Sequence, residues 1–230
     1  MATGAADHPF TPDLFERADE SDDALFYATA RKVVHIDEPA IAAVSAFFAE
    51  QLPPGGELLD LMASWRSHLP KRLERKRVTG LGMNAEEMSD NPDLDAWVVH
   101  DLNKNPQLPF ADATFDGGML TVSMQYLTQP IEVFRSLARC LKPGAPFIVI
   151  VSHRCFPTKA VKIWNQCQGM RERMELGMAY FSFAGGFADV LGVDLRPSVP
   201  PEEDPVRAII GKREGKGLAD RRSSTGWRRR

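Results

Sequence analysis

The segment TQPIEVFRSLARCLKPGAPFIVIV, residues 128–151, joins the clearest helix of the sequence to its most apolar strand. Apolar side chains recur at three- and four-residue steps within 131–141 and form one face of the expected helix. Pro130 suits the first helical turn, and Pro143-Gly144 ends the helix. The run FIVIV at 147–151 contains no polar residue, as is typical of a strand covered on both faces in a parallel sheet. This segment therefore predicts the α/β class.

Segments that alternate between strand and helix extend from this unit in both directions. Further strands are predicted at 57–61, 77–83, 96–99, 118–122, 190–195 and 206–212. Helices are predicted at 39–52 behind an Asp37 cap, at 69–76, from 84 to 88 and over 159–178, with an aromatic turn at 180–187. Strands separated by helices form right-handed βαβ units, and the last two strands can pair antiparallel. We therefore expect a single domain with a doubly wound, mostly parallel seven-stranded sheet and an antiparallel edge strand.

The two ends of the chain differ in charge, although the net charge of its 230 residues is only −3. Acidic residues are frequent in 1–23, which we interpret as a lead-in before a domain at 24–213. Basic residues are frequent in 214–230, which we expect to be a disordered tail with a solvated charge run rather than a nucleic-acid contact. No apolar run is long enough to span a bilayer, and the three cysteines have no motif spacing. A cytoplasmic protein without a metal site is expected.

Four motifs follow one another along the chain with a characteristic order and spacing. They are Leu59-Asp60-Leu61, Val78-Thr79-Gly80, Leu108-Pro109-Phe110 with Phe115-Asp116, and Leu141-Lys142-Pro143-Gly144. Over residues 40–155 this order resembles the class I S-adenosylmethionine-dependent methyltransferases of type 11. The resemblance implies a Rossmann-like methyltransferase fold, S-adenosyl-L-methionine as the cofactor and a methyl acceptor as the second ligand.

Ligands of open α/β sheets bind at the carboxyl ends of the strands, and the resemblance assigns roles to residues there. Asp60 matches the start of the loop around the methionine part of the cofactor, although an Asp in this place can instead cap the following turn. Asp101 matches the acidic residue that contacts the adenine amino group, and Leu102 matches the apolar wall beside that ring. Ser123 matches the end of the strand below the transferable methyl group. The cofactor-binding candidates are Asp60, Met62, Ser64, Asn84, Asp101, Leu102 and Ser123.

Two departures from the family pattern affect the cofactor site. Family members have three glycines after the first strand, whereas this chain has Met62, Ser64 and Arg66. Family members also carry an acidic residue for the ribose at the end of the second strand, where this chain has Gly82. Ser64 can substitute as a contact for the cofactor carboxylate, and Asn84 can substitute for the ribose.

Transfer of a methyl group from a sulfonium needs no fixed catalytic dyad, because the cofactor supplies the electrophile and the leaving group. A base is needed only when the acceptor must lose a proton. His35 and His68 are candidates for that base, and each has the alternative interpretation of a packed or capping residue. Tyr126 is a candidate for the wall of the acceptor pocket.

Three functional hypotheses follow from the sequence. The first is a methyltransferase that acts on a small-molecule acceptor, because the C-terminal part is compact. The alternative is a catalytically inactive methyltransferase-like protein with a binding or regulatory role, for which the altered loop is the evidence. A nicotinamide oxidoreductase is the weakest, because its dinucleotide loop also needs glycines and the LPF, FD and LKPG series stays unexplained.

Overall fold

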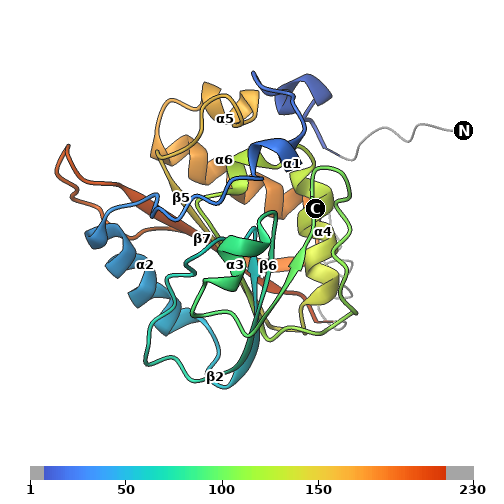
Figure 1. Cartoon of the computed structure of the whole chain (residues 1–230), viewed down its shortest axis with the longest axis vertical. Helices are drawn as coiled ribbons and strands as arrows, with labels where there is room; N and C mark the ends of the chain where they lie inside the picture. Colours follow the sequence, from blue (N-terminus) through green and yellow to red (C-terminus); the bar gives the residue numbers. More distant parts are fainter. Residues whose placement is uncertain (1–7, 216–230) are drawn as a thin grey trace, which may run out of the picture.

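A computed structural model describes residues 8–215 and contains one seven-stranded sheet (Figure 1). The strands are β1 Gly56–Leu61, β2 Arg75–Gly82, β3 Ala96–Val99, β4 Gly117–Thr121, β5 Pro146–Ser152, β6 Phe187–Asp194 and β7 Val206–Arg213. They lie in the order β3-β2-β1-β4-β5-β7-β6. Neighbouring strands among β1 to β5 are parallel, while β7 is antiparallel to both β5 and β6. The predicted doubly wound sheet and the antiparallel pairing of its last two strands are confirmed.

Helices cover both faces of the sheet. They are α1 Asp23–Phe26, α2 Glu38–Gln51, α3 Ala85–Ser89, α4 Pro130–Cys140, α5 Lys162–Gln166 and α6 Met170–Ala184, with short 3₁₀ turns η1 Pro12–Phe15 and η2 Met124–Tyr126. Figure 1 shows α2 and α4 on opposite sides of the sheet. Alternate residues of β5 enter two cores: Val149 packs in the cluster of α4 and α6, and Ile148 packs in the cluster of α2. Asp37 caps α2 as expected, since its carboxylate accepts the amide proton of Ala40 at 2.8 Å.

Two predicted elements are wrong, and the helix predicted over 159–178 is divided into α5 and α6. No helix forms at 69–76, because residues 75 and 76 belong to β2, in which Arg75 pairs with Gly56 of β1. Leu69 and Leu73 have helical spacing, but they are buried beside the α2 core from an irregular segment that includes Pro70. The aromatic turn predicted at 180–187 is instead the end of α6, which Gly185 terminates with a φ of 69°.

The N-terminal segment packs on the sheet rather than lying loose. Phe10 and Phe15 pack against the core of α4 and α6. Arg17 donates two hydrogen bonds of 2.8 Å to Asp23. The side chain of Lys159 is completely buried, and its Nζ lies 3.2 Å from an Asp23 oxygen. Figure 1 shows this blue segment crossing the upper ends of the strands, so it covers the carboxyl edge of the sheet.

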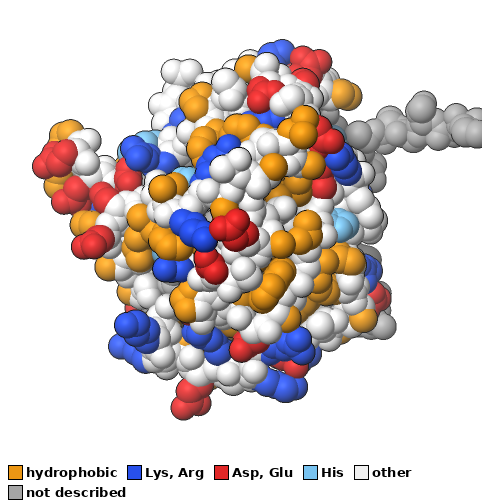
Figure 2. Space-filling model, viewed as in Figure 1, with side chains coloured by type: hydrophobic (Ala, Val, Ile, Leu, Met, Phe, Trp, Pro, Cys, Tyr) orange, Lys and Arg blue, Asp and Glu red, His pale blue; other side chains and the backbone are white. Residues whose placement is uncertain are grey.

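The surface shown in Figure 2 carries a mixture of charged and hydrophobic side chains. Basic side chains gather at the lower end of this view, where Figure 1 places β2. Among the residues exposed near the start of that strand are Lys71, Arg72, Lys76 and Arg77. No helix within 8–215 combines the length and the apolarity that a membrane span requires. Residues 216–230, most of the basic tail, lie outside the described part.

Candidate functional site

A cavity of about 480 Å³ lies at the carboxyl ends of the five parallel strands. Its floor is formed by residues that follow β1 to β5, and the N-terminal residues from Asp23 to His35 contribute to its wall. Eight of the sequence candidates line it: His35, Met62, Ser64, Asn84, Asp101, Leu102, Ser123 and Tyr126. The volume lies in the range of small-molecule pockets, which is about 300–1,000 Å³.

The loop after β1 runs across the end of β2. The amide of Ala63 donates to the carbonyl of Leu81 at 2.9 Å, which brings the loop down onto β2. A Cβ atom at Gly82 would lie only 2.2 Å from the carbonyl oxygen of Ala63. The loop therefore occupies the space that a side chain at position 82 would need.

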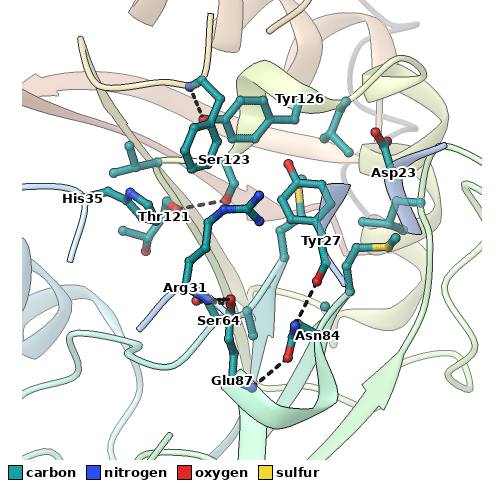
Figure 3. A pocket seen from close by; sticks show the side chains of 18 of the residues that line it. Asp23, Tyr27, Arg31, His35, Ser64, Asn84, Glu87, Thr121, Ser123 and Tyr126 are labelled. Atoms are coloured by element: carbon teal, nitrogen blue, oxygen red, sulfur yellow. Dashed lines mark hydrogen bonds between the residues drawn. The ribbon is translucent and has the colours of Figure 1, made fainter. Parts of the chain in front are cut away.

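Ser64, Asn84 and Glu87 form a network at the end of β2. The Ser64 hydroxyl donates to one Glu87 carboxylate oxygen at 2.6 Å, and the Arg31 amide donates to the other at 2.6 Å. Asn84 caps α3 by accepting the Glu87 amide proton at 2.9 Å, and its own amide donates to the carbonyl of Tyr27 at 2.8 Å (Figure 3). Ser64 and Asn84 thus already bind protein groups, and Glu87 brings a carboxylate to the cavity next to Gly82.

Asp60 and His68 lie outside the main cavity. Both line a neighbouring cavity of about 50 Å³ below the β1 loop. The Ser67 hydroxyl donates to Asp60 at 2.6 Å, and Asn91 donates to Ser67 at 2.9 Å. Complete burial raises the pKa of Asp60 to about 7, although the Ser67 bond acts in the opposite direction. Burial likewise lowers the pKa of His68, which favours the neutral imidazole.

One carboxylate oxygen of Asp101 accepts hydrogen bonds from the protein, whereas the other accepts none from the residues that the structure describes. Oδ1 accepts the amide protons of Asn103 at 2.9 Å and Lys104 at 3.2 Å. Oδ2 is buried and has no hydrogen-bond partner among the described residues, and the Lys104 ammonium is 3.8 Å away. A buried carboxylate oxygen without a donor is costly, so a donor from a bound ligand would stabilise it. The side chain of Leu102 is buried next to it on the cavity wall.

The end of β4 provides a second group of polar atoms. The Ser123 hydroxyl donates to the carbonyl of Thr121 at 2.9 Å, whereas the Thr121 hydroxyl is buried without a partner in residues 8–215. The Tyr126 hydroxyl accepts the amide proton of Phe156 at 2.9 Å. Burial raises the pKa of Tyr126 to about 12, so its phenol stays protonated at neutral pH.

Several residues of the cavity wall were not predicted from the sequence: Tyr27, Arg31, Glu87 and Asn103. Asn103 donates to Asp23 and to the carbonyl of Tyr126, both at 2.9 Å, and so ties the N-terminal segment to η2. Burial raises the pKa of Asp23, but bonds from Asn103 and Arg17 outweigh it and lower the pKa overall. Glu87 could have been found from the capping-box spacing of Asn84 and Glu87. The N-terminal residues carry no motif, since only the chain path brings them to the strand ends.

Comparisons with known proteins agree with this architecture. A family model described as a methyltransferase domain matches residues 63–149. Methyltransferase phqN of Penicillium fellutanum is 34% identical over 82 residues, which cover 33% of this chain and 25% of that protein. The matched part is therefore a quarter of the length of that curated relative.

Two solved structures illustrate the likeness of fold. A methyltransferase in complex with the Trm112 methyltransferase activator of Haloferax volcanii superposes with a TM-score of 0.55 at 17% identity, over 77% of this chain and 92% of that chain. Geranyl diphosphate C-methyltransferase from Streptomyces coelicolor A3(2), solved with S-adenosyl-L-homocysteine, superposes with a TM-score of 0.51 at 15% identity, over 76% of each chain.

Proposed function

We propose that this chain is a class I S-adenosylmethionine-dependent methyltransferase that transfers a methyl group from S-adenosyl-L-methionine to a small-molecule acceptor in the cavity. The observation that carries the proposal is the buried, unpartnered Oδ2 of Asp101, which lies beside Leu102 on the cavity wall. We assign the adenine amino group to this pair, as the family resemblance implies. An amino group is a hydrogen-bond donor, so it supplies what the carboxylate lacks.

Other residues of the cavity fit the ribose and the methionine part of the cofactor, with contacts that differ from those of the family pattern. Glu87 supplies a carboxylate near the end of β2, and we assign it to the ribose hydroxyls that the family acid would bind. Met62 and Ser64 form the wall along the methionine part, and Ser123 lies at the end of β4 below the methyl group. Asn84 holds Glu87 and the N-terminal segment in place, so its role is to position other residues.

When bound, the cofactor supplies a methyl group that is activated on a sulfonium. The chain's own task is then to align the acceptor and to exclude water. His35 lies on the cavity wall beside Phe156, and desolvation lowers its pKa, so the neutral ring can accept a proton from an acceptor hydroxyl or amine. The protonated Tyr126 holds the loop after β5 by its bond to Phe156.

A small acceptor is favoured by the cover that the N-terminal segment forms. Tyr27 and Arg31 lie across the cavity, and their backbone groups are bonded to Asn84 and Glu87 (Figure 3). A macromolecule would need to displace this segment and its buried Asp23 anchor. The cavity volume of about 480 Å³ suits the cofactor with a compact partner.

Calorimetric titration with S-adenosyl-L-homocysteine tests the proposal. We expect the wild-type chain to bind it, and Asp101→Asn to weaken the affinity about tenfold or more, as for the loss of a hydrogen bond to a charged group. Asp112→Asn is the matched control, because Asp112 is exposed and pairs with Arg139 away from the cavity. Failure of the wild-type chain to bind the ligand at millimolar concentration would overturn the proposal.

A further inference from the structure

We propose that the acceptor carries a carboxylate beside a flat apolar body, and that Arg31 binds this carboxylate. The inference rests on the proposed methyltransferase function and specifies the chemical class of its acceptor. It starts from Arg31, whose role the family motifs do not assign. Its backbone amide is fixed by Glu87 at 2.6 Å, so the side chain starts from a defined place in the cavity wall.

The guanidinium of Arg31 faces the cavity with its hydrogen-bonding capacity unused. Figure 3 shows it extending between Tyr27 and the end of β4 at Thr121 and Ser123. Its Nη1 is buried and has no hydrogen-bond partner within residues 8–215. A guanidinium presents paired N–H donors that match the two oxygens of a carboxylate. The unused donors therefore indicate a planar anion as the missing partner.

The charges around Arg31 favour an anion at the same place. Arg154 and His35 lie on this side of the cavity, and the Arg154 Nε donates to the carbonyl of His35 at 3.3 Å. The acids Glu87, Asp23 and Asp204 already bind other protein groups. Glu87 accepts from Ser64 and from the Arg31 amide, while Asp23 is bonded to Arg17, Lys159 and Asn103. Asp204 pairs with His153 at 3.1 Å and lies 3.8 Å from Arg154.

Aromatic rings surround the guanidinium and define the rest of the ligand. Its Cζ lies 4.4 Å from the ring centre of Phe26 and 5.6 Å from that of Phe156. The rings of Tyr126 and Phe156 are stacked with centres 5.9 Å apart, and both line the cavity together with Tyr27. Flat apolar walls next to a cation suit a flat apolar molecule with a negative end.

The ring of Phe156, beside which the Arg31 guanidinium lies, is distant in the sheet order from the proposed adenine and ribose contacts, which favours the acceptor as the partner of Arg31. Phe156 follows β5, whereas Asp101 and Glu87 follow β3 and β2 on the other side of β1 and β4. The proposed contacts for the adenine and the ribose are therefore separated from the Phe156 ring by the ends of β1 and β4. The cofactor has its own carboxylate, and the experiment must distinguish the two.

The test uses the full chain with three ligands. Calorimetry measures S-adenosyl-L-homocysteine and 5′-methylthioadenosine, which lacks the amino-acid part of the cofactor. Ligand-observed NMR then compares benzoate with its neutral analogue benzamide on the chain saturated with S-adenosyl-L-homocysteine. The variants are Arg31→Gln, Arg31→Lys and the control Lys32→Gln, whose side chain is partly exposed and pairs with Glu86 and Asp90 outside the cavity. Circular dichroism checks that each variant is folded.

We expect wild type and Lys32→Gln to bind benzoate about tenfold more tightly than benzamide, as for one charge-assisted hydrogen-bonded pair. Arg31→Gln should lose this preference while it keeps its affinity for S-adenosyl-L-homocysteine, and Arg31→Lys should keep part of the preference. Equal binding of benzoate and benzamide by wild type would overturn the inference and leave the methyltransferase function standing. Loss of S-adenosyl-L-homocysteine but not of 5′-methylthioadenosine in Arg31→Gln would also overturn it, since Arg31 would then bind the cofactor carboxylate. Failure of wild type to bind S-adenosyl-L-homocysteine would instead count against the methyltransferase function itself.

Discussion

The polar side chains at the strand ends that form the cavity are used in different ways. At the adjacent ends of β1 and β2, the β1–β2 end, the side chains of Ser64, Asn84 and Glu87 are each hydrogen-bonded to the protein. At the ends of β3 and β4, which flank the β1–β2 end on either side, Asp101 Oδ2 and the Thr121 hydroxyl are buried without hydrogen-bond partners in the described part of the chain. Buried polar groups are nearly always satisfied in folded proteins. The ends of β3 and β4 are therefore the ones prepared for a ligand, while the β1–β2 end mainly holds loops together.

The difference also explains how far a family motif can be transferred. At the end of β3 the Asp101 carboxylate has an oxygen without a hydrogen-bond donor among residues 8–215, where the family resemblance implies the adenine contact. At the β1–β2 end the family pattern is absent, and the loop occupies the space that a side chain at position 82 would need. A motif residue is thus informative when its functional atoms lack a partner in the protein.

The largest expected effect concerns the buried ion pairs of Lys159, which hold the N-terminal segment over the cavity. Lys159→Met removes a completely buried ammonium that pairs with Asp19 and Asp23. Breaking a buried ion pair in this way should lower the free energy of unfolding by about 3 kcal/mol or more. Urea unfolding measures the change.

Lys162→Met is the matched control for the anchor. Lys162 pairs with Asp13 on the surface, where an ion pair contributes about 0–1 kcal/mol. Equal losses in the two variants would mean that the Lys159 cluster does not anchor the segment.

A somewhat smaller effect is expected from restoring the family acid at the β1–β2 end. Gly82→Asp places a Cβ 2.2 Å from the Ala63 carbonyl oxygen, so the loop must move. We expect a loss of about 2 kcal/mol in the free energy of unfolding, as for overpacking of a tight site. Gly118→Ala is the control, because the nearest atom to its Cβ is at 3.4 Å, an ordinary contact. Gly82→Asp could instead be as stable as wild type and bind S-adenosyl-L-homocysteine more tightly. The loop would then be free to move, and the proposed difference between the β1–β2 end and the ends of β3 and β4 would be wrong.

The sequence predicted the fold well because its signals are local. The apolar run of β5, the Asp37 cap and the periodicity of α4 each act within a few residues, and together with βαβ handedness they predict a doubly wound, mostly parallel sheet. The helix predicted at 69–76 is wrong, because the helical spacing of Leu69 and Leu73 also fits two buried side chains in an irregular segment. Pairing with β1 then extended β2 to Arg75.

The candidate site was predicted only in part, because its cover comes from a distant segment. Arg31 and Tyr27 reach the cavity through bonds to Glu87 and Asn84, more than fifty positions away in the sequence. Nothing in the local composition around Arg31 signals that contact. Glu87 has a local signal in the Asn84 cap, but its contact with the Ser64 hydroxyl depends on the path of the β1 loop.

The last expected effect is a dependence of stability on pH, caused by the buried Asp60 of β1. The pKa of Asp60 is raised from 3.8 to about 7 by burial, so the native chain keeps a proton that the unfolded chain releases between these values. Wild-type stability should therefore fall as the pH rises through this window, while Asp60→Asn, which has no such proton, lacks this contribution. The free energy of unfolding of the variant relative to wild type should rise by about 1.4 kcal/mol per pH unit at most.

Urea unfolding of both chains between pH 4 and 8 measures this difference, and Asp116→Asn provides the contrast. Burial acts to raise the pKa of Asp116, but bonds from Lys142 and from the Glu57 amide lower it overall, so any change relative to wild type should occur only at lower pH. If the difference in free energy of unfolding between Asp60→Asn and wild type does not change with pH, burial does not raise the pKa of Asp60. The small cavity next to the β1 loop would then admit water or a cation that stabilises the ionised carboxylate. In that case the β1–β2 end would contain a second ionised carboxylate besides that of Glu87, and it would differ less from the ends of β3 and β4 than the hydrogen bonds indicate.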